Sequence, residues 1–95
     1  MEKKIRKYDA IMKELRAIYV AKNSDYGNSV TDTYAKFGDV SFMVRITDKI
    51  NRATSLLSKN NRQVQDEKLE DTIKDMVNYG ILWLIERDEN IENVG

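Results

Sequence analysis

Oxygen-bearing side chains recur along one edge of the segment from residue 66 to residue 85. Glu67, Asp71 and Asp75 follow one another at steps of four, and Asn78 comes three residues later. On a helix, this spacing places all four side chains on one face. Neighbouring like charges destabilise a helix by about 0.2–0.5 kcal/mol per pair, so we expect a compensating cation close by. It is either a basic side chain or a metal ion.

A largely basic face precedes this acidic one in the sequence. Four charged side chains recur at steps of three and four, namely Arg45, Asp48, Lys49 and Arg52. If the two segments form antiparallel helices that turn near residue 61, residues equally distant from the turn come level. This register predicts that Lys49 lies near Asp75. It also places Arg52 near Asp71.

Two interpretations of these facing charges remain open. The first is a ladder of ion pairs, in which the cost of desolvation offsets the attraction. The second is a mixed site where carboxylates hold Mg²⁺ and the cations of Arg45, Lys49 and Arg52 meet phosphate oxygens. The candidate metal ligands are then Asp48, Glu67, Asp71 and Asp75, and the candidate catalytic carboxylates are Glu67, Asp71 and Asp75. Nucleotide phosphates suit such a site.

Residues 22–29, with the sequence KNSDYGNS, supply a third candidate group. Asn, Asp, Ser and Gly favour turns, so we expect the first helix to end near Asn23 and a loop to follow. A tyrosine beside amide, carboxylate and ammonium groups can also stack on a base and hydrogen-bond its edges. The nucleotide-binding candidates are Lys22, Asn23, Asp25 and Tyr26, together with Asn78. The alternative is a loop that only terminates the helix.

Composition favours an all-α fold and excludes several kinds of chemistry. The 95 residues include no histidine, cysteine or proline, which excludes disulfides, Cys/His zinc sites and histidine acid–base catalysis. Sixteen basic residues balance sixteen acidic ones, so we expect neither DNA nor RNA polymers nor a membrane as partners. No stretch approaches the ~18 apolar residues of a membrane span. We therefore expect a cytoplasmic protein.

Hydrophobic spacing predicts three long helices in one domain of residues 1–95. The predicted helices cover residues 2–22, residues 40–58 and a segment that begins after its cap Asp66. A short helical turn is expected at residues 31–37, between the first two helices, and Gly38 is expected to stop it. Residues 59–63 join the last two helices, and residues 88–95 fray. The buried side of the third helix is expected to carry Leu69, Ile73, Met76 or Val77, Gly80, Ile81 and Leu84. A domain of this size buries only a modest share of its surface, so a homo-oligomer is the natural expectation. A compact monomer of this length would have a radius of gyration of about 12 Å.

Three ordered strings in this chain resemble the nucleotide modification associated domain family of phages and prophages. They are residues 22–29, residues 42–52 (FMVRITDKINR) and residues 66–79 (DEKLEDTIKDMVNY). The third string is also similar to the second metal-binding helix of all-α nucleotide pyrophosphatases, the MazG and dimeric dUTPase group. The resemblance implies an oligomeric helical bundle that binds a nucleoside triphosphate through Mg²⁺ and releases pyrophosphate. If the chain is phage-encoded, as the resemblance implies, we expect it in the host cytoplasm.

The chain departs from the pyrophosphatase pattern on its second helix. That pattern has two glutamates three residues apart, whereas this sequence offers Asp48 among cations. We therefore weigh three functions. The first is a MazG-like, Mg²⁺-dependent nucleotide pyrophosphohydrolase, which the acidic face favours. The second is a phage-type sponge that sequesters a linear or cyclic signalling nucleotide without cleaving it, which the cations favour. The third is a helical adaptor whose ion pairs are structural.

Overall fold

The described residues fold into helices, as the composition predicts. The computed structural model describes the backbone of residues 2–58 and 62–94, and the side chains of residues 2–22, 29–58 and 67–89. The helices are α1 (Glu2–Phe37), α2 (Asp39–Leu57) and α3 (Arg62–Val94). No strand occurs within these ranges. The all-α prediction is confirmed.

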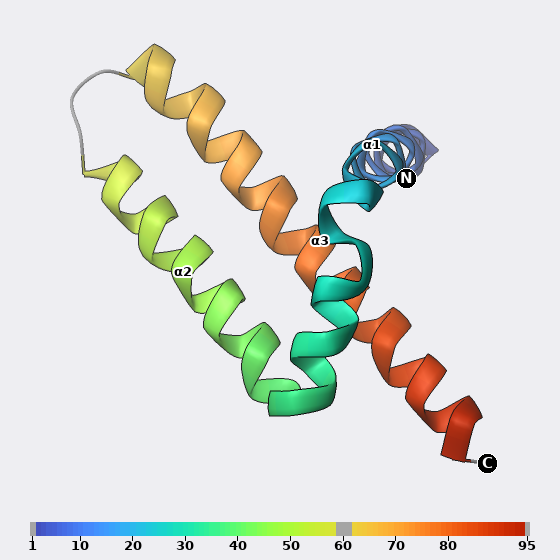
Figure 1. Cartoon of the computed structure of the whole chain (residues 1–95). Coiled ribbons are helices and arrows are strands. Elements are labelled where there is room, and N and C mark those ends of the chain that lie inside the picture. Colours follow the sequence, from blue (N-terminus) through green and yellow to red (C-terminus); the bar gives the residue numbers. More distant parts are fainter. Residues whose placement is uncertain (1, 59–61, 95) are drawn as a thin grey trace.

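The helices α2 and α3 form an antiparallel hairpin, and α1 lies against the far side of α3 before it turns toward α2 (Figure 1). The N-terminal part of α1 is seen end-on in Figure 1, whereas its green C-terminal part runs across the view, so α1 bends between them. The molecule measures 48 × 33 × 24 Å, with a radius of gyration of 15.5 Å. It is more open than a compact chain of this length, for which about 12 Å is expected.

The predicted loop after residue 22 is wrong. The helical spacing of residues 2–22 is confirmed, but α1 continues through residues 23–29 to Phe37. Proline, the one residue with a large helix penalty, is absent, and a single glycine costs a helix only about 1 kcal/mol. Contacts of the last turns, such as the edge-to-face pair of Tyr34 and Phe42 with ring centroids 5.6 Å apart, offset that cost. The predicted helical turn at residues 31–37 therefore joins α1.

A sharp corner at Gly38 separates α1 from α2, in agreement with the predicted stop. Gly38 has a φ of 68° and a ψ of −150°, a backbone conformation that residues with a Cβ rarely adopt. Its N–H donates to the carbonyl of Tyr34 at 2.7 Å. Its own carbonyl accepts from the N–H of Ser41 at 3.1 Å and from the Ser41 hydroxyl at 2.8 Å. The chain direction changes here within one residue.

The third helix is longer than the sequence predicts. It begins at Arg62, so Asp66 lies inside α3 instead of capping it. Residues 59–61 of the predicted connection lie outside the described residues, while residues 62 and 63 are helical. The helix continues to Val94, through most of the segment that we expected to fray. The hairpin α2–α3 consequently has one long arm, which gives α1 a surface to pack on.

The core is small, and its buried side chains come from all three helices. Its buried apolar side chains are Leu15, Phe42, Ala53, Leu56 and Leu82. Two polar side chains, Thr72 and Asn78, are buried with them, and the Thr72 hydroxyl donates to the carbonyl of Lys68 at 2.7 Å. The predicted buried side of α3 is wrong in part, because Ile73, Val77 and Leu84 are 39–44% exposed. The neighbouring helices approach α3 on an adjacent face.

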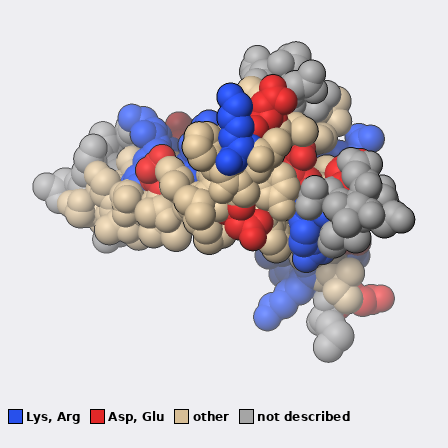
Figure 2. Space-filling model, turned by 60° about the horizontal axis from the view of Figure 1, so that its bottom comes forward, with Lys and Arg blue, Asp and Glu red and all other residues tan. Residues whose placement is uncertain are grey.

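Charged side chains of both signs cover the surface. Figure 2 shows basic and acidic groups interspersed over one face, with uncharged surface between them. The charge pattern therefore forms no large field of one sign on this face. Within the described ranges, every helix is too short or too polar to cross a membrane.

Candidate functional site

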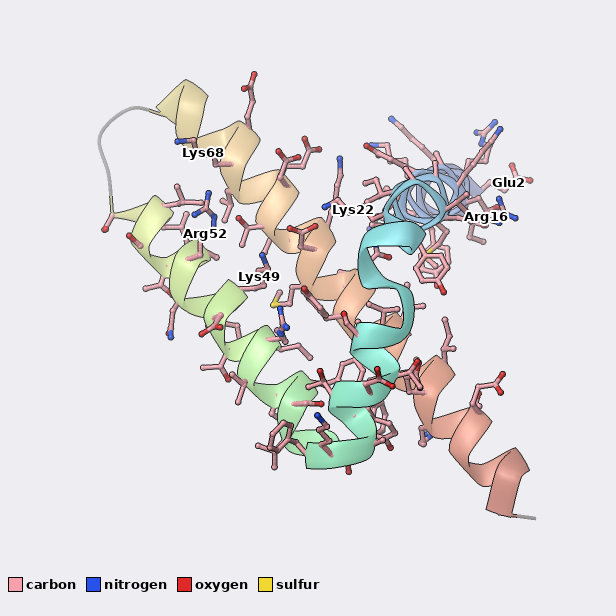
Figure 3. The ribbon with its side chains drawn as sticks, viewed as in Figure 1. Glu2, Arg16, Lys22, Lys49, Arg52 and Lys68 are labelled. Atoms are coloured by element: carbon pink, nitrogen blue, oxygen red, sulfur yellow. The ribbon has the colours of Figure 1, made fainter. Side chains whose placement is uncertain are left out.

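One carboxylate on α3 is shared by lysines of the two other helices. Asp75 Oδ1 lies 3.4 Å from Lys22 Nζ of α1, and its Oδ2 lies 3.4 Å from Lys49 Nζ of α2. Figure 3 shows both lysines extending toward α3. The side chains of Lys49 and Asp75 are each 27% exposed. The predicted pairing of Lys49 with Asp75 is confirmed, and we name these three residues the charged junction.

A cavity of about 240 Å³ lies one helical turn from the charged junction. Arg45 precedes Lys49 by four residues, and Tyr79 follows Asp75 by four, so both sit next to the junction on their helices. The Arg45 guanidinium lies over the Tyr79 ring, 6.0 Å from its centroid. The lining residues described are Ser29, Val30, Thr33, Ser41, Phe42, Arg45 and Tyr79. The cavity thus combines a cation, two aromatic rings and hydroxyl groups.

Hydrogen bonds around Asp39 join the three helices beside the Gly38 corner. The indole N–H of Trp83 donates to Asp39 Oδ1 at 2.8 Å, and the Tyr34 hydroxyl donates to the same oxygen at 3.4 Å. Partial burial raises the pKa of Tyr34 above its usual value of 10.0, and the charge of Asp39 and this hydrogen bond raise it further. At neutral pH the phenol therefore stays protonated and donates. These bonds tie α1, α2 and α3 together at one point.

The four predicted metal ligands do not come together within one chain. Among the described residues, no three acidic side chains lie close enough to hold a metal ion. Asp75 faces two lysines, whereas Asp48, Glu67 and Asp71 are exposed. Successive steps of four also spread the acidic face along α3, since each step advances about 6 Å. This donor set does not form a Mg²⁺ site by itself.

Two further residues from the sequence analysis have different surroundings from those expected. Asn78 is 2% exposed, and its Nδ2 donates to the backbone carbonyl of Leu15 at 3.4 Å, so it fastens α1 to α3. Arg52 is exposed on α2 and forms no ion pair with Asp71 within the described part of the chain. Figure 3 shows Arg52 nearer than Lys49 to the connection between α2 and α3.

The remaining predicted residues lie in the bend of α1. The side chains of Asn23, Asp25 and Tyr26 fall outside the described residues, although their backbone is helical. Lys22, at the start of this stretch, is described and contacts Asp75. Of the predicted set, the structure therefore brings together Lys22, Lys49 and Asp75, with Arg45 one turn away.

Sequence reasoning missed the aromatic part of the site. Neither Tyr79 nor Phe42 was among the candidate site residues, yet both line the cavity. The signal was present in the register that predicted the Lys49–Asp75 pair, because stepping four residues back on α2 and four forward on α3 pairs Arg45 with Tyr79. The α1 wall could not be found in this way, because a loop was expected after residue 22 and the path of α1 relative to the hairpin was not predicted.

The fold and this site define a small α-helical protein with a cationic, partly aromatic pocket at the junction of its helices. Comparison with known families gives a match over residues 22–86 to the family described as Nucleotide modification associated domain 1. The chain belongs to this family, and the matched segment contains every residue of the charged junction and of the cavity lining. No curated protein and no solved structure matches the chain.

Proposed function

We propose that this protein binds a nucleotide in the cavity and at the charged junction beside it. Arg45 and Lys49, with Lys22 from α1, receive the phosphate oxygens, and the base or sugar occupies the space beside Tyr79 and Phe42. Guanidinium and ammonium groups form strong, charge-assisted hydrogen bonds with phosphate. Aromatic side chains stack on the faces of bases, and this stacking tolerates any base because every base has a π-face. The family description points in the same direction.

The observation that carries this proposal is the position of Arg45. Its guanidinium lies at the cavity, over the Tyr79 ring, and makes no ion pair with any described carboxylate. It is exposed and four residues from Lys49, so both cations are available to one anionic ligand. An arginine placed over an aromatic ring is held by the cation–π attraction and needs little reorganisation to bind phosphate.

Binding without cleavage is better supported than hydrolysis. A two-metal or one-metal hydrolytic site needs several converging carboxylates, and the described residues supply no group of three. Asp75 is engaged with lysines, which favours a role in orienting cations over a role in holding a metal. The proposed activity is therefore that of a nucleotide sponge, which retains a linear or cyclic nucleotide and releases it chemically unchanged.

The test is a binding panel of nucleoside mono-, di- and triphosphates and cyclic nucleotides, read by thermal shift and calorimetry. A true ligand stabilises the folded chain by RT ln(1 + c/Kd), where c is its free concentration, so the melting temperature rises with the logarithm of that concentration once the site is saturated. Arg45→Gln should weaken the best ligand by about 10–100-fold, because a hydrogen bond to a charged group contributes about 1.5–3 kcal/mol. Arg16→Gln, an exposed arginine on α1, is the matched control and should bind normally. If no nucleotide shifts the melting temperature, the protein is instead an adaptor with structural ion pairs.

The acidic face of α3 supports a second candidate, a Mg²⁺-dependent nucleotide pyrophosphohydrolase. Glu67 and Asp71 are exposed, one turn apart, and form no ion pair with the described residues. Both carboxylates could therefore bind a cation whose remaining ligands come from other groups. Incubation of the protein with nucleoside triphosphates and Mg²⁺, followed by measurement of pyrophosphate, separates the two candidates. Quantitative recovery of intact nucleotide from a bound complex excludes this one.

A further inference from the structure

Six residues of α2 form an exposed seam with the spacing of a coiled coil. They alternate at steps of three and four along the helix: Val40, Met43, Thr47, Ile50, Thr54 and Leu57. The four large apolar members are 50–70% exposed, and both threonines are exposed as well. Such a repeat over five turns is the pattern by which one helix packs its side chains into another.

This seam differs from the face that α2 uses within the subunit. Phe42, Ala53 and Leu56 are buried and face the rest of the chain. The seam lies beside that face, so the apolar surface of α2 is wide. The rest of the subunit covers only the part that contains Phe42, Ala53 and Leu56. A surface helix that packs on a single neighbour normally carries one apolar stripe and a polar opposite side. The second stripe indicates a second helical neighbour.

Thr54 can enter such a contact at little cost. The Thr54 hydroxyl already donates to the carbonyl of Ile50 at 2.9 Å within the same helix. Its hydrogen-bonding need is therefore met, and the side chain presents a methyl group to the seam. A buried polar atom is expensive only when it has no partner. The hydroxyl of Thr54 therefore does not oppose burial, and Thr47 is the one other polar member of the seam.

We propose that α2 packs antiparallel against α2 of a second copy, across a two-fold axis that passes between residues 48 and 49. In this register, each seam residue meets a residue of complementary size. Val40 meets Leu57 of the second copy, and Met43 meets Thr54 of the second copy. Thr47 meets Ile50 of the second copy. Every contact occurs twice, as an isologous interface requires.

Charge distribution favours a second copy over an unrelated helix. No charged residue occurs in the seam, nor on its outer flank, which is formed by Val44, Asn51 and Ser58. A two-fold axis brings only the side chains next to it near their own counterparts, so a charge at position 47 or 50 would repel its own copy. Heterologous coiled coils instead select their partners through charged flanking residues.

The size of the seam is sufficient for a weak to moderate dimer. Burial of the seam and of Val44 on both subunits removes on the order of 1,000 Å² from water, near the lower bound for a specific interface. The open subunit, with its 15.5 Å radius of gyration and small core, gains apolar burial that it lacks alone.

The oligomeric state in solution tests the proposal. Sedimentation and light scattering over a concentration series should show a dimer for the unmodified chain. Ile50→Glu places a charge next to the axis in both subunits and should weaken self-association at least 100-fold. Ile5→Glu, at an equally exposed position on α1 (53% against 50%), should leave the dimer intact. Circular dichroism verifies that both variants remain helical. A monomeric unmodified chain, or a dimer that survives Ile50→Glu, overturns the proposal.

Cysteine cross-linking tests the direction of packing, because the natural chain has no cysteine. A mixture of the Thr47→Cys and Ile50→Cys variants should form a disulfide-linked heterodimer under mild oxidation. Met43→Cys alone should not cross-link, because its two copies lie far from the axis in an antiparallel pair. Efficient cross-linking of Met43→Cys would indicate parallel helices and contradict the proposed register.

Discussion

At the scale of single residues, two polar side chains of α3 hold α1 in place. Asp75 accepts from Lys22, and Asn78 donates to the Leu15 carbonyl from a buried position. Both lie on the face that sequence spacing assigned to ligand binding. One of them contributes to the candidate site, whereas the other contributes to the core. Residues with the same helical spacing can thus belong to a binding site or to the core. The burial of the side chain, which is nearly complete for Asn78 and partial for Asp75, distinguishes the two cases.

Replacement of Asn78 by alanine should reduce the free energy of unfolding by about 1–3 kcal/mol. The change removes a buried hydrogen bond and leaves the Leu15 carbonyl without this donor. Urea denaturation followed by circular dichroism measures the effect. Ser55→Ala, at an exposed position of α2 outside the seam and its flank, is the control and should change stability by less than about 0.5 kcal/mol. Equal effects of both variants would show that the buried amide has no special role.

Part of the site could be predicted from the sequence. Helical periodicity and a turn near residue 61 suffice to pair Lys49 with Asp75, because a hairpin register is set by counting from its turn. The contact of Lys22 with Asp75 depends on the path of α1, which local sequence does not determine. The burial of Asn78 likewise depends on where α1 crosses α3. Long-range placement therefore limited the prediction.

At the scale of helices, glycines at two positions have opposite roles. Gly38 forms the corner between α1 and α2 with a φ of 68°, whereas Gly80 lies within α3. A Cβ added at either position would meet no atom within 4 Å, so steric crowding is the same for both. The difference between them is backbone conformation alone.

Gly38→Ala should destabilise the protein by about 1–3 kcal/mol, because alanine is strained at this φ and ψ. Gly80→Ala should stabilise it by about 0.5–1 kcal/mol, because alanine loses less conformational freedom than glycine in a helix. Thermal or urea unfolding of the two variants beside the unmodified chain measures both changes. Destabilisation by Gly80→Ala would mean that the open space beside it is filled in solution, and a neutral Gly38→Ala would mean that the corner relaxes.

Helix positions were easier to predict than helix ends. Apolar spacing located all three helices and Gly38 located the corner. The ends were missed at residues 23–29 and at Asp66, where turn-favouring residues lie inside helices. Such residues lower helix propensity by less than about 1 kcal/mol each, which tertiary contacts readily exceed. Propensity alone therefore does not locate a helix end in a chain without proline.

At the scale of the whole molecule, ionisable groups join elements that are distant in sequence. Lys74 of α3 donates to Glu14 of α1 at 2.7 Å, and this hydrogen bond raises the pKa of Lys74 above its usual value of 10.5. The attraction of Glu14 and Glu70 adds to the effect, whereas partial burial opposes it. Tyr34, whose pKa is also raised, joins α1 to α2 through Asp39. Both groups bind their protons more tightly in the folded state.

Stability should therefore fall at alkaline pH. A raised pKa in the folded state contributes stability that is complete below the unfolded value and is lost as pH rises through the folded value. With unfolded values of 10.0 for Tyr34 and 10.5 for Lys74, the decline begins near pH 10. Melting temperatures measured from pH 8 to pH 11.5 should show it. Tyr34→Phe should flatten the first part of the decline, and an unchanged slope in that variant would exclude the contribution of Tyr34.

The single-residue corner at Gly38 also fixes the rotational phase of α1 relative to the hairpin. One amino acid added to the end of α1 just before Gly38 would turn every preceding side chain of α1 by about 100° around the helix axis. Lys22 would then point away from Asp75, while the partnership of Lys49 with Asp75, on the other side of the insertion, would persist. The length of this joint is thus as much a determinant of the pocket as the identity of the residues that line it.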